Sequence, residues 1–144
     1  MRRFIFSVFV LSFMSYGAFA QNKPSCAILL CSEAYKNDSG NTNITSVFSG
    51  FNEAAVGKSE KFTVYVRFQG FSLNTVHRFY ITLEDPKGKN ILTTKEASFS
   101  FLSNLDIRAH TANWTVDFEM KGTYIIKVYV DDKEVERLYF GVGD

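Results

Sequence analysis

The segment 114–130 constrains the fold of this chain more than any other part of the sequence. Apolar and polar residues alternate from Trp114 to Phe118, and the alternation resumes at Tyr124 after Lys121-Gly122. Successive side chains of a β-strand point to opposite faces, so a period of two predicts strands with one buried face. We therefore expect a hairpin of two β-strands around a turn at Lys121-Gly122, with the apolar residues of both strands in the core.

The same period of two recurs through most of the sequence. Further strands are expected at 26–31, 44–48, 61–68, 77–84, 91–94, 97–101 and 135–142. About seven to nine short strands with turns roughly every ten residues are typical of an antiparallel β-sandwich, and a barrel is the alternative. The sequence therefore predicts an all-β fold.

Turn-forming residues separate these strands. Asp85-Pro86-Lys87-Gly88 predicts a type I turn, because Asp caps its first position, Pro fixes φ at the second and Gly suits the fourth. Asp131-Asp132 predicts a hairpin turn, because Asp tolerates the left-handed conformation. Residues 36–43 and 69–76 are expected to be loops, and 51–58 at most one short helical turn.

The N-terminus has the features of a secretory signal peptide. Arg2-Arg3 gives a positive start, residues 4–14 form an apolar run, and Ala18-Phe19-Ala20 supplies a small-x-small cleavage site. The run is too short for a membrane span, which needs about 20 apolar residues. We expect a secreted or periplasmic protein without a stable membrane anchor. The predicted division of the chain is a signal peptide at 1–20, a flexible lead-in at 21–25 and one domain at 26–144.

The net charge gives no reason to expect nucleic acid as a partner. The full chain has 16 Lys and Arg against 15 Asp and Glu, and loss of Arg2 and Arg3 with the signal peptide leaves 14 against 15. Proteins that bind nucleic acid or anionic membranes electrostatically concentrate positive charge. The partner classes that remain open are a protein and a glycan.

Two resemblances follow from the motifs. Gly122 and Tyr124 resemble the Gly-x-Tyr strand of immunoglobulin-like domains, in which the tyrosine forms a corner by hydrogen-bonding to nearby backbone. The usual Asp of that motif is replaced by Met120 and the usual Cys by Ile126, so the inter-sheet disulfide of antibody domains is absent.

The second resemblance covers most of the predicted domain. Residues 27–33, 45–50, 85–88 and 122–124 follow one another as in an uncharacterised bacterial family of small immunoglobulin-like proteins. This resemblance implies an immunoglobulin-like β-sandwich and no known activity. It supplies no catalytic or binding residue.

Cys26 and Cys31 are the two cysteines of the chain. If 26–31 is one strand, five steps place their Cα atoms about 16 Å apart, whereas a disulfide needs about 7 Å or less. An intrachain disulfide therefore forms only if the intervening residues loop. The other interpretation is two free thiols, one buried and one partly exposed, with pairing to another chain still open.

The residues suggest no catalytic, metal or cofactor site. His77 and His110 are the only histidines, they are expected on the solvated surface, and His110 falls in a turn-like segment. A cysteine-dependent hydrolase would pair Cys31 with one of them, but neither flanking sequence matches a known signature. The acidic run 131–136 is interrupted by basic residues, which favours a charged hairpin over a calcium loop.

Three tyrosines are candidates for contact with a partner. Tyr65, Tyr80 and Tyr129 fall on the polar faces of predicted strands, and they form an aromatic stripe if those strands are neighbours. Ordinary cross-strand pairing is the alternative. We expect a non-catalytic binding domain that uses an open sheet face or an edge strand. An enzyme inhibitor or a carbohydrate-binding module is the second hypothesis, and a cysteine-dependent hydrolase the third.

Overall fold

The computed structural model describes residues 23–143, and this part of the chain is all-β, as predicted. The predicted signal peptide, residues 1–20, lies outside the described residues, as does the start of the predicted lead-in. The elements in chain order are β1 (Ser25–Lys36), β2 (Thr42–Phe48), β3 (Gly50–Phe51), the 3₁₀ turn η1 (Glu53–Ala55), β4 (Ser59–Gln69), β5 (His77–Glu84), β6 (Asn90–Thr93), β7 (Ala97–Phe99), β8 (Ile107–Asp117), β9 (Gly122–Val130) and β10 (Lys133–Val142).

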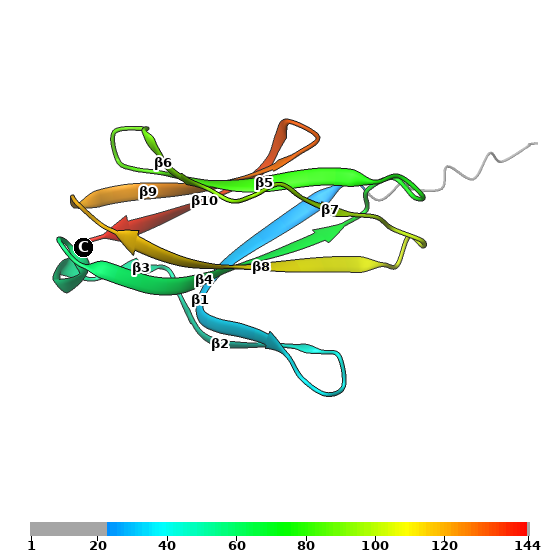
Figure 1. The fold of residues 1–144 in the computed structure, drawn as a ribbon, viewed down its shortest axis with the longest axis horizontal. Helices are drawn as coiled ribbons and strands as arrows, with labels where there is room; N and C mark the ends of the chain where they lie inside the picture. The colour runs from blue at the N-terminus through cyan, green and yellow to red at the C-terminus, as the bar shows by residue number, and fades with distance from the viewer. Residues whose placement is uncertain (1–22, 144) are drawn as a thin grey trace, which may run out of the picture.

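The strands form two sheets that lie one over the other (Figure 1). The four-stranded sheet has the order β2-β1-β4-β8. The six-stranded sheet has the order β3-β10-β9-β5-β6, and β7 also pairs with β5. The short β3 runs parallel to β10, whereas the other named strand pairs are antiparallel.

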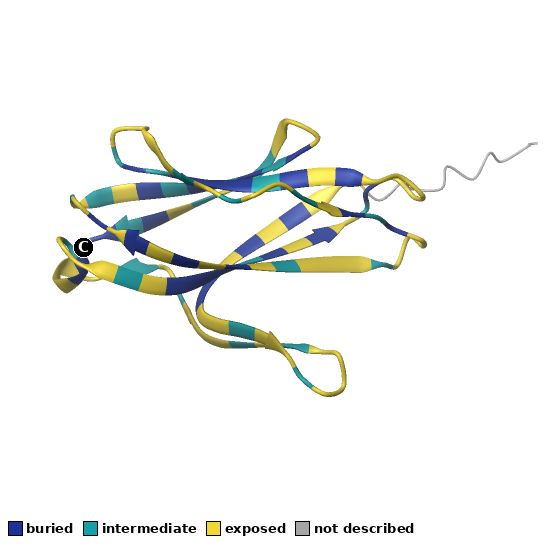
Figure 2. Cartoon of the chain, viewed as in Figure 1, coloured by how far each residue is buried: buried dark blue, intermediate teal, exposed yellow. Residues whose placement is uncertain are grey.

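The core fills the space between the two sheets. Buried and exposed residues alternate along the strands (Figure 2), because every second side chain faces the opposite sheet. Aromatic rings from both sheets meet there: Phe68 of β4 stacks on Phe99 of β7 with ring centroids 4.5 Å apart. Each such buried ring contributes about 1.5–3 kcal/mol of burial free energy, so these contacts hold the sheets together.

The segment 114–130 does not form the predicted hairpin. Trp114 lies on β8 in the four-stranded sheet, whereas Tyr124 lies on β9 in the six-stranded sheet. The turn before Gly122, whose φ is 132°, therefore connects the two layers. The predicted core residues are buried as expected, since their two strands face each other across the core.

The strand β8 is longer than the sequence predicts. It begins at Ile107 and includes His110, which was expected in a turn. The core-facing positions of its first half are occupied by Arg108 and His110, so the apolar period of two begins only at Ala112. Because the first half of β8 has polar residues at these positions, it lacks the apolar alternation by which a strand is predicted.

The other predicted turns and loops agree with the structure. The Gly88 N–H donates to Asp85 O at 2.9 Å, and Asp85 Oδ1 caps the turn by accepting from two further backbone N–H groups. Asp131 and Asp132 both have positive φ, at 49° and 63°, in the turn between β9 and β10. The predicted loop at 36–43 is the tip of the β1–β2 hairpin, which extends away from the sheets in Figure 1.

Candidate functional site

Most edge strands of the two sheets are short or interrupted. An edge strand carries unpaired backbone N–H and C=O groups that can pair with another chain, and natural proteins shorten, bend or charge such edges. Here β3, β6 and β7 have only two, four and three residues. The ladder of β2 is interrupted at Ser46, whose φ is 50°. β3 covers β10 only at Gly141 and Val142, and along the rest of β10 the ladder with β9 shifts register between Glu134 and Glu136.

The edge of β8 has none of these features. Its 11 residues pair with β4 without a register shift, and no other named strand pairs with it among residues 23–143. It contains no Pro and no Lys, and its charged residues are Arg108 near one end and Asp117 at the other. We call the unpaired side of Ile107–Asp117 the β8 edge. It is a long, regular strand edge that is open to pairing.

The hydrogen bonds at the end of β8 show which of its backbone groups face this edge. Phe118 donates its N–H to Lys58 O at 3.2 Å and accepts from the Gly57 N–H at 2.7 Å, so its backbone groups face β4. Backbone groups alternate in direction along an antiparallel strand. The odd-numbered residues of β8, including Thr111 and Asn113, therefore direct their N–H and C=O groups to the β8 edge.

Two pockets of about 280 Å³ each lie between β8 and the opposite sheet. The first, here called the apolar pocket after its three phenylalanine rings, is lined by Phe68, Phe79, Phe99 and His110 and also by Ser98, Ser100, Arg108 and Ala109. The ring centroids of Phe79 and His110 lie 4.9 Å apart. Burial lowers the pKa of His110, which favours the neutral form of its ring. The apolar pocket lies beside the first half of β8.

The second pocket, here the acidic pocket, lies beside the last residues of β8. Its lining includes the acidic residues Asp85, Asp117 and Glu119 and the apolar residues Ile91, Leu92 and Val116. The Asp85 carboxylate accepts from two backbone N–H groups of its own turn, so Asp117 and Glu119 are the acidic residues left for a ligand. Lys89 is its one basic lining residue. Among the ion pairs of residues 23–143, none involves Asp117 or Glu119. The pocket therefore presents negative charge next to apolar surface.

The three tyrosines expected as a contact stripe do not come together. Tyr80 and Tyr129 are cross-strand neighbours on the outer face of the six-stranded sheet, with ring centroids 4.9 Å apart and an interplanar angle of 10°. Tyr65 lies on β4 in the other sheet. The two stacked rings cover each other's faces, so this is the cross-strand pairing that was the alternative.

A model of a known protein family matches residues 26–143, which include both pockets and the whole of β8. Its description is "Family of unknown function (DUF6941)". The chain belongs to this family.

The other comparisons add little to the membership in DUF6941. No curated protein matches the chain. A solved structure described as a putative beta-galactosidase from Bacteroides fragilis is similar over 62% of this chain and 14% of that one, with 15% sequence identity and a TM-score of 0.44. The chain thus corresponds to a small fraction of that protein's length, and the likeness is too low to carry an argument.

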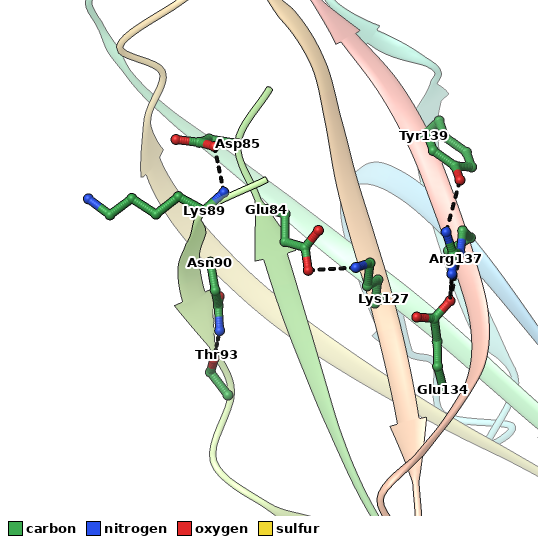
Figure 3. Close-up of polar contacts among 9 residues, drawn as sticks. All are labelled: Glu84, Asp85, Lys89, Asn90, Thr93, Lys127, Glu134, Arg137 and Tyr139. Carbon is green, nitrogen blue, oxygen red and sulfur yellow. Dashed lines mark hydrogen bonds and ion pairs between the residues drawn. The ribbon is translucent and has the colours of Figure 1, made fainter. Parts of the chain in front are cut away.

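Two ion pairs lie on the six-stranded sheet of this DUF6941 member (Figure 3). Lys127 of β9 donates to Glu84 of β5 at 2.6 Å, and this hydrogen bond raises the pKa of Lys127. Along β10, Arg137 contacts Glu134 at 2.6 Å and the Tyr139 hydroxyl at 3.2 Å. These charges are paired with one another, and the side chains of Lys127 and Glu84 are largely shielded from solvent.

Both cysteines are free and buried. Cys26 packs in the core, where desolvation and then the charge of Glu136 raise its pKa to about 12. Burial also raises the pKa of Cys31, whose Sγ lies 3.6 Å from Thr63 O. The prediction of one partly exposed thiol is wrong, because Cys31 is fully buried between the strands β2 and β4 that pair with β1 at this point. The raised pKa values disfavour the reactive thiolate.

The two histidines are not the solvated surface residues that we expected. His77 is buried, and its Nδ1 lies 2.7 Å from Asp131 Oδ2. His110 is half-buried against Phe79. No hydrogen bond of the described residues joins either ring to a cysteine. No sequence pattern predicts the His77–Asp131 contact, which joins residues 54 positions apart.

Within residues 23–143, no group of three or more His, Cys, Asp or Glu side chains is placed to hold a metal ion. That part of the chain also has no helix of the length and apolar character that a membrane crossing requires. The sequence predicts contact through an edge strand in general terms, but it does not identify β8 or its pockets.

Proposed function

We propose that this protein is an exported, non-catalytic binding domain with an immunoglobulin-like β-sandwich fold, and that it binds an extended segment of another protein along the β8 edge. The observation that carries the proposal is the contrast between the regular β8 edge and the other, shortened or interrupted edges. Strand addition of this kind gains affinity from backbone hydrogen bonds and specificity from pockets for alternate side chains. Export rests on the signal-like features of residues 1–20.

The immunoglobulin-like assignment is supported by the tyrosine corner and the strand order. The Tyr124 hydroxyl donates to Met120 O at 3.0 Å. Constant-type domains have strands ABED in one sheet and CFG in the other. With β9 taken as F, its neighbours β5 and β10 correspond to C and G, and β4 and β8 to B and E. Among residues 23–143 no strand occupies the D position next to β8, where we propose that the partner segment binds.

The test is selection from a library of random peptides displayed on phage, using the chain from Gln21 to Asp144 as bait. We expect enrichment of extended peptides that protect the amides of Thr111 and Asn113 from hydrogen exchange. Thr111→Pro removes an edge-facing N–H and should abolish binding, whereas Thr111→Val keeps it and should not. Selected peptides that bind Thr111→Pro equally well would overturn the proposal.

The export part of the proposal has its own test. The full chain, expressed in a bacterium with a Sec pathway, should be found in the periplasm or medium with Gln21 as its new N-terminus. Retention in the cytoplasm with Met1 intact would contradict it. This result is independent of the binding experiment.

A further inference from the structure

We infer that the segment bound at the β8 edge runs antiparallel to β8 and carries a basic side chain followed, six residues later, by an apolar one. The inference rests on the proposed function and specifies its ligand. It follows from the two pockets beside β8, which are equal in volume but differ in chemistry.

The spacing follows from the positions of the pockets along the strand. A strand added to β8 lies in the plane of the four-stranded sheet, so its inward side chains stand opposite the even-numbered residues of β8. The apolar pocket is lined by His110 and the acidic pocket by Val116. Side chains opposite these two residues are six positions apart, which is about 20 Å in an extended chain.

The side-chain types follow from the pocket linings. In the acidic pocket a Lys or Arg stem can lie on Ile91 and Leu92 while its charged end reaches Asp117 and Glu119. In the apolar pocket the aromatic rings and the neutral His110 favour a Phe or Leu side chain. Arg108, which lines the same pocket, would repel a second basic group.

The direction follows from the order of the pockets. β8 runs from the apolar pocket to the acidic one, so an antiparallel segment meets the acidic pocket first. We favour the antiparallel direction because the ladders of this sheet are antiparallel and such pairs are slightly more stable. The expected ligand motif is therefore basic, five residues, apolar.

A second copy of this chain is the less suitable occupant. Its own β8 has Arg108 and Trp114 at the required spacing, but both side chains are already engaged. Trp114 is only 6% exposed in the core, and the Arg108 Nε donates to Ser100 O at 2.8 Å. The β8 strand of a second copy therefore does not supply the two anchors, and we assign the occupant to a segment of another protein.

The test compares two synthetic peptides of alternating Thr and Ser that carry one Lys and one Phe. In the first peptide Phe follows Lys by six residues, and in the control by five, which sends the anchors to opposite faces. Binding is followed by changes in the amide NMR spectrum. We expect the first peptide to bind at least about tenfold more tightly, a difference of about 1.4 kcal/mol.

Charge reversal in the acidic pocket identifies the site. Asp117→Lys combined with Glu119→Lys should weaken binding of the Lys peptide and strengthen binding of a Glu peptide with the same spacing. Equal binding of the peptides with the two spacings, or no effect of the charge reversal, would overturn the inference.

The inference and the proposed function can fail separately. If library peptides that need the Thr111 N–H lack the motif, the inference fails while the proposed function stands. A dimer of the chain that Thr111→Pro dissociates would show that a second copy occupies the edge, which would overturn both.

Discussion

The Tyr124 hydroxyl donates a hydrogen bond of 3.0 Å to the backbone carbonyl of Met120. These residues flank the turn by which the chain leaves the four-stranded sheet and enters the six-stranded one. Tyr124 is 1% exposed and its ring packs against Phe118 and Phe140. The hydrogen bond therefore stabilises the turn that connects the two sheets.

We predict that Tyr124→Phe lowers the free energy of unfolding by about 1 kcal/mol, because it removes this bond and leaves the Met120 carbonyl without its partner. For a domain of this size the melting temperature should fall by roughly 3–6 °C. Differential scanning calorimetry gives the measurement. Tyr80→Phe, on the outer sheet face, is the control and should change the melting temperature little. An equal fall in melting temperature in both variants would contradict a stabilising role of the hydrogen bond between Tyr124 and Met120.

The Asp131–His77 contact predicts a pH-dependent stability. The hydrogen bond with His77, and then that from the Arg78 N–H, lower the pKa of Asp131 in the folded protein. A carboxyl group with a depressed folded pKa contributes stability above its unfolded pKa, and this contribution is lost as the pH falls through the folded value. Asp131→Asn should therefore lower the melting temperature near neutral pH. The difference from the wild type should shrink as the pH falls below the ordinary Asp pKa of about 3.9 and approaches the lower folded value.

The control for this prediction lies in the same turn. Asp132→Asn removes the same charge from a neighbouring residue that also has positive φ, a conformation that Asn tolerates. It should leave the pH dependence of unfolding close to that of the wild type. If the melting temperatures of the two variants depend on pH in the same way, the loss of one negative charge explains the effect and the His77 contact does not.

The buried thiols should be unreactive in the folded protein. At about pH 8 a thiol with an ordinary pKa of about 8.5 is partly ionised, whereas burial raises the pKa of Cys26 to about 12 and also raises that of Cys31. We expect Ellman's reagent to detect no fast-reacting thiol in the native protein and both thiols after unfolding in urea without reductant. Absence of both thiols from the unfolded, unreduced protein would instead reveal a disulfide. The raised Cys26 pKa also predicts that stability is lost as the pH rises above the ordinary thiol pKa toward 12.

The sequence predicts individual strands well where one face is uniformly apolar. The strand expected at 77–84 has those bounds as β5, since Phe79, Ile81 and Leu83 are all buried. Periodicity identifies the buried face of a strand, but it does not identify the strand's neighbours. Periodicity therefore predicts a hairpin over 114–130, although the two halves of this segment belong to different sheets.

The candidate site could not be predicted for a related physical reason. The β8 edge exists because no other strand pairs with that side of β8 among residues 23–143, and strand pairing is not visible in the sequence. The first half of β8 also has polar residues at core-facing positions. The apolar pocket combines residues of β4, β5, β7 and β8, and only the tertiary fold brings these together. The tyrosines were assigned to polar strand faces correctly, but the pairing of Tyr80 with Tyr129, and not with Tyr65, depends on strand order.

The close approach of Gly50 to Gly141 gives the last prediction. The two residues are partners in the parallel pairing of β3 with β10, and a Cβ at Gly50 would lie 2.5 Å from the Gly141 carbonyl oxygen. Gly50→Ala should push β3 away from β10 and lower the free energy of unfolding by about 1–3 kcal/mol, which is the usual effect of overpacking. Hydrogen exchange of the Gly143 N–H, which donates to Phe51 O at 2.9 Å, should accelerate. Ser49→Ala, at the exposed preceding residue, is the control, and unchanged exchange in Gly50→Ala would contradict the prediction.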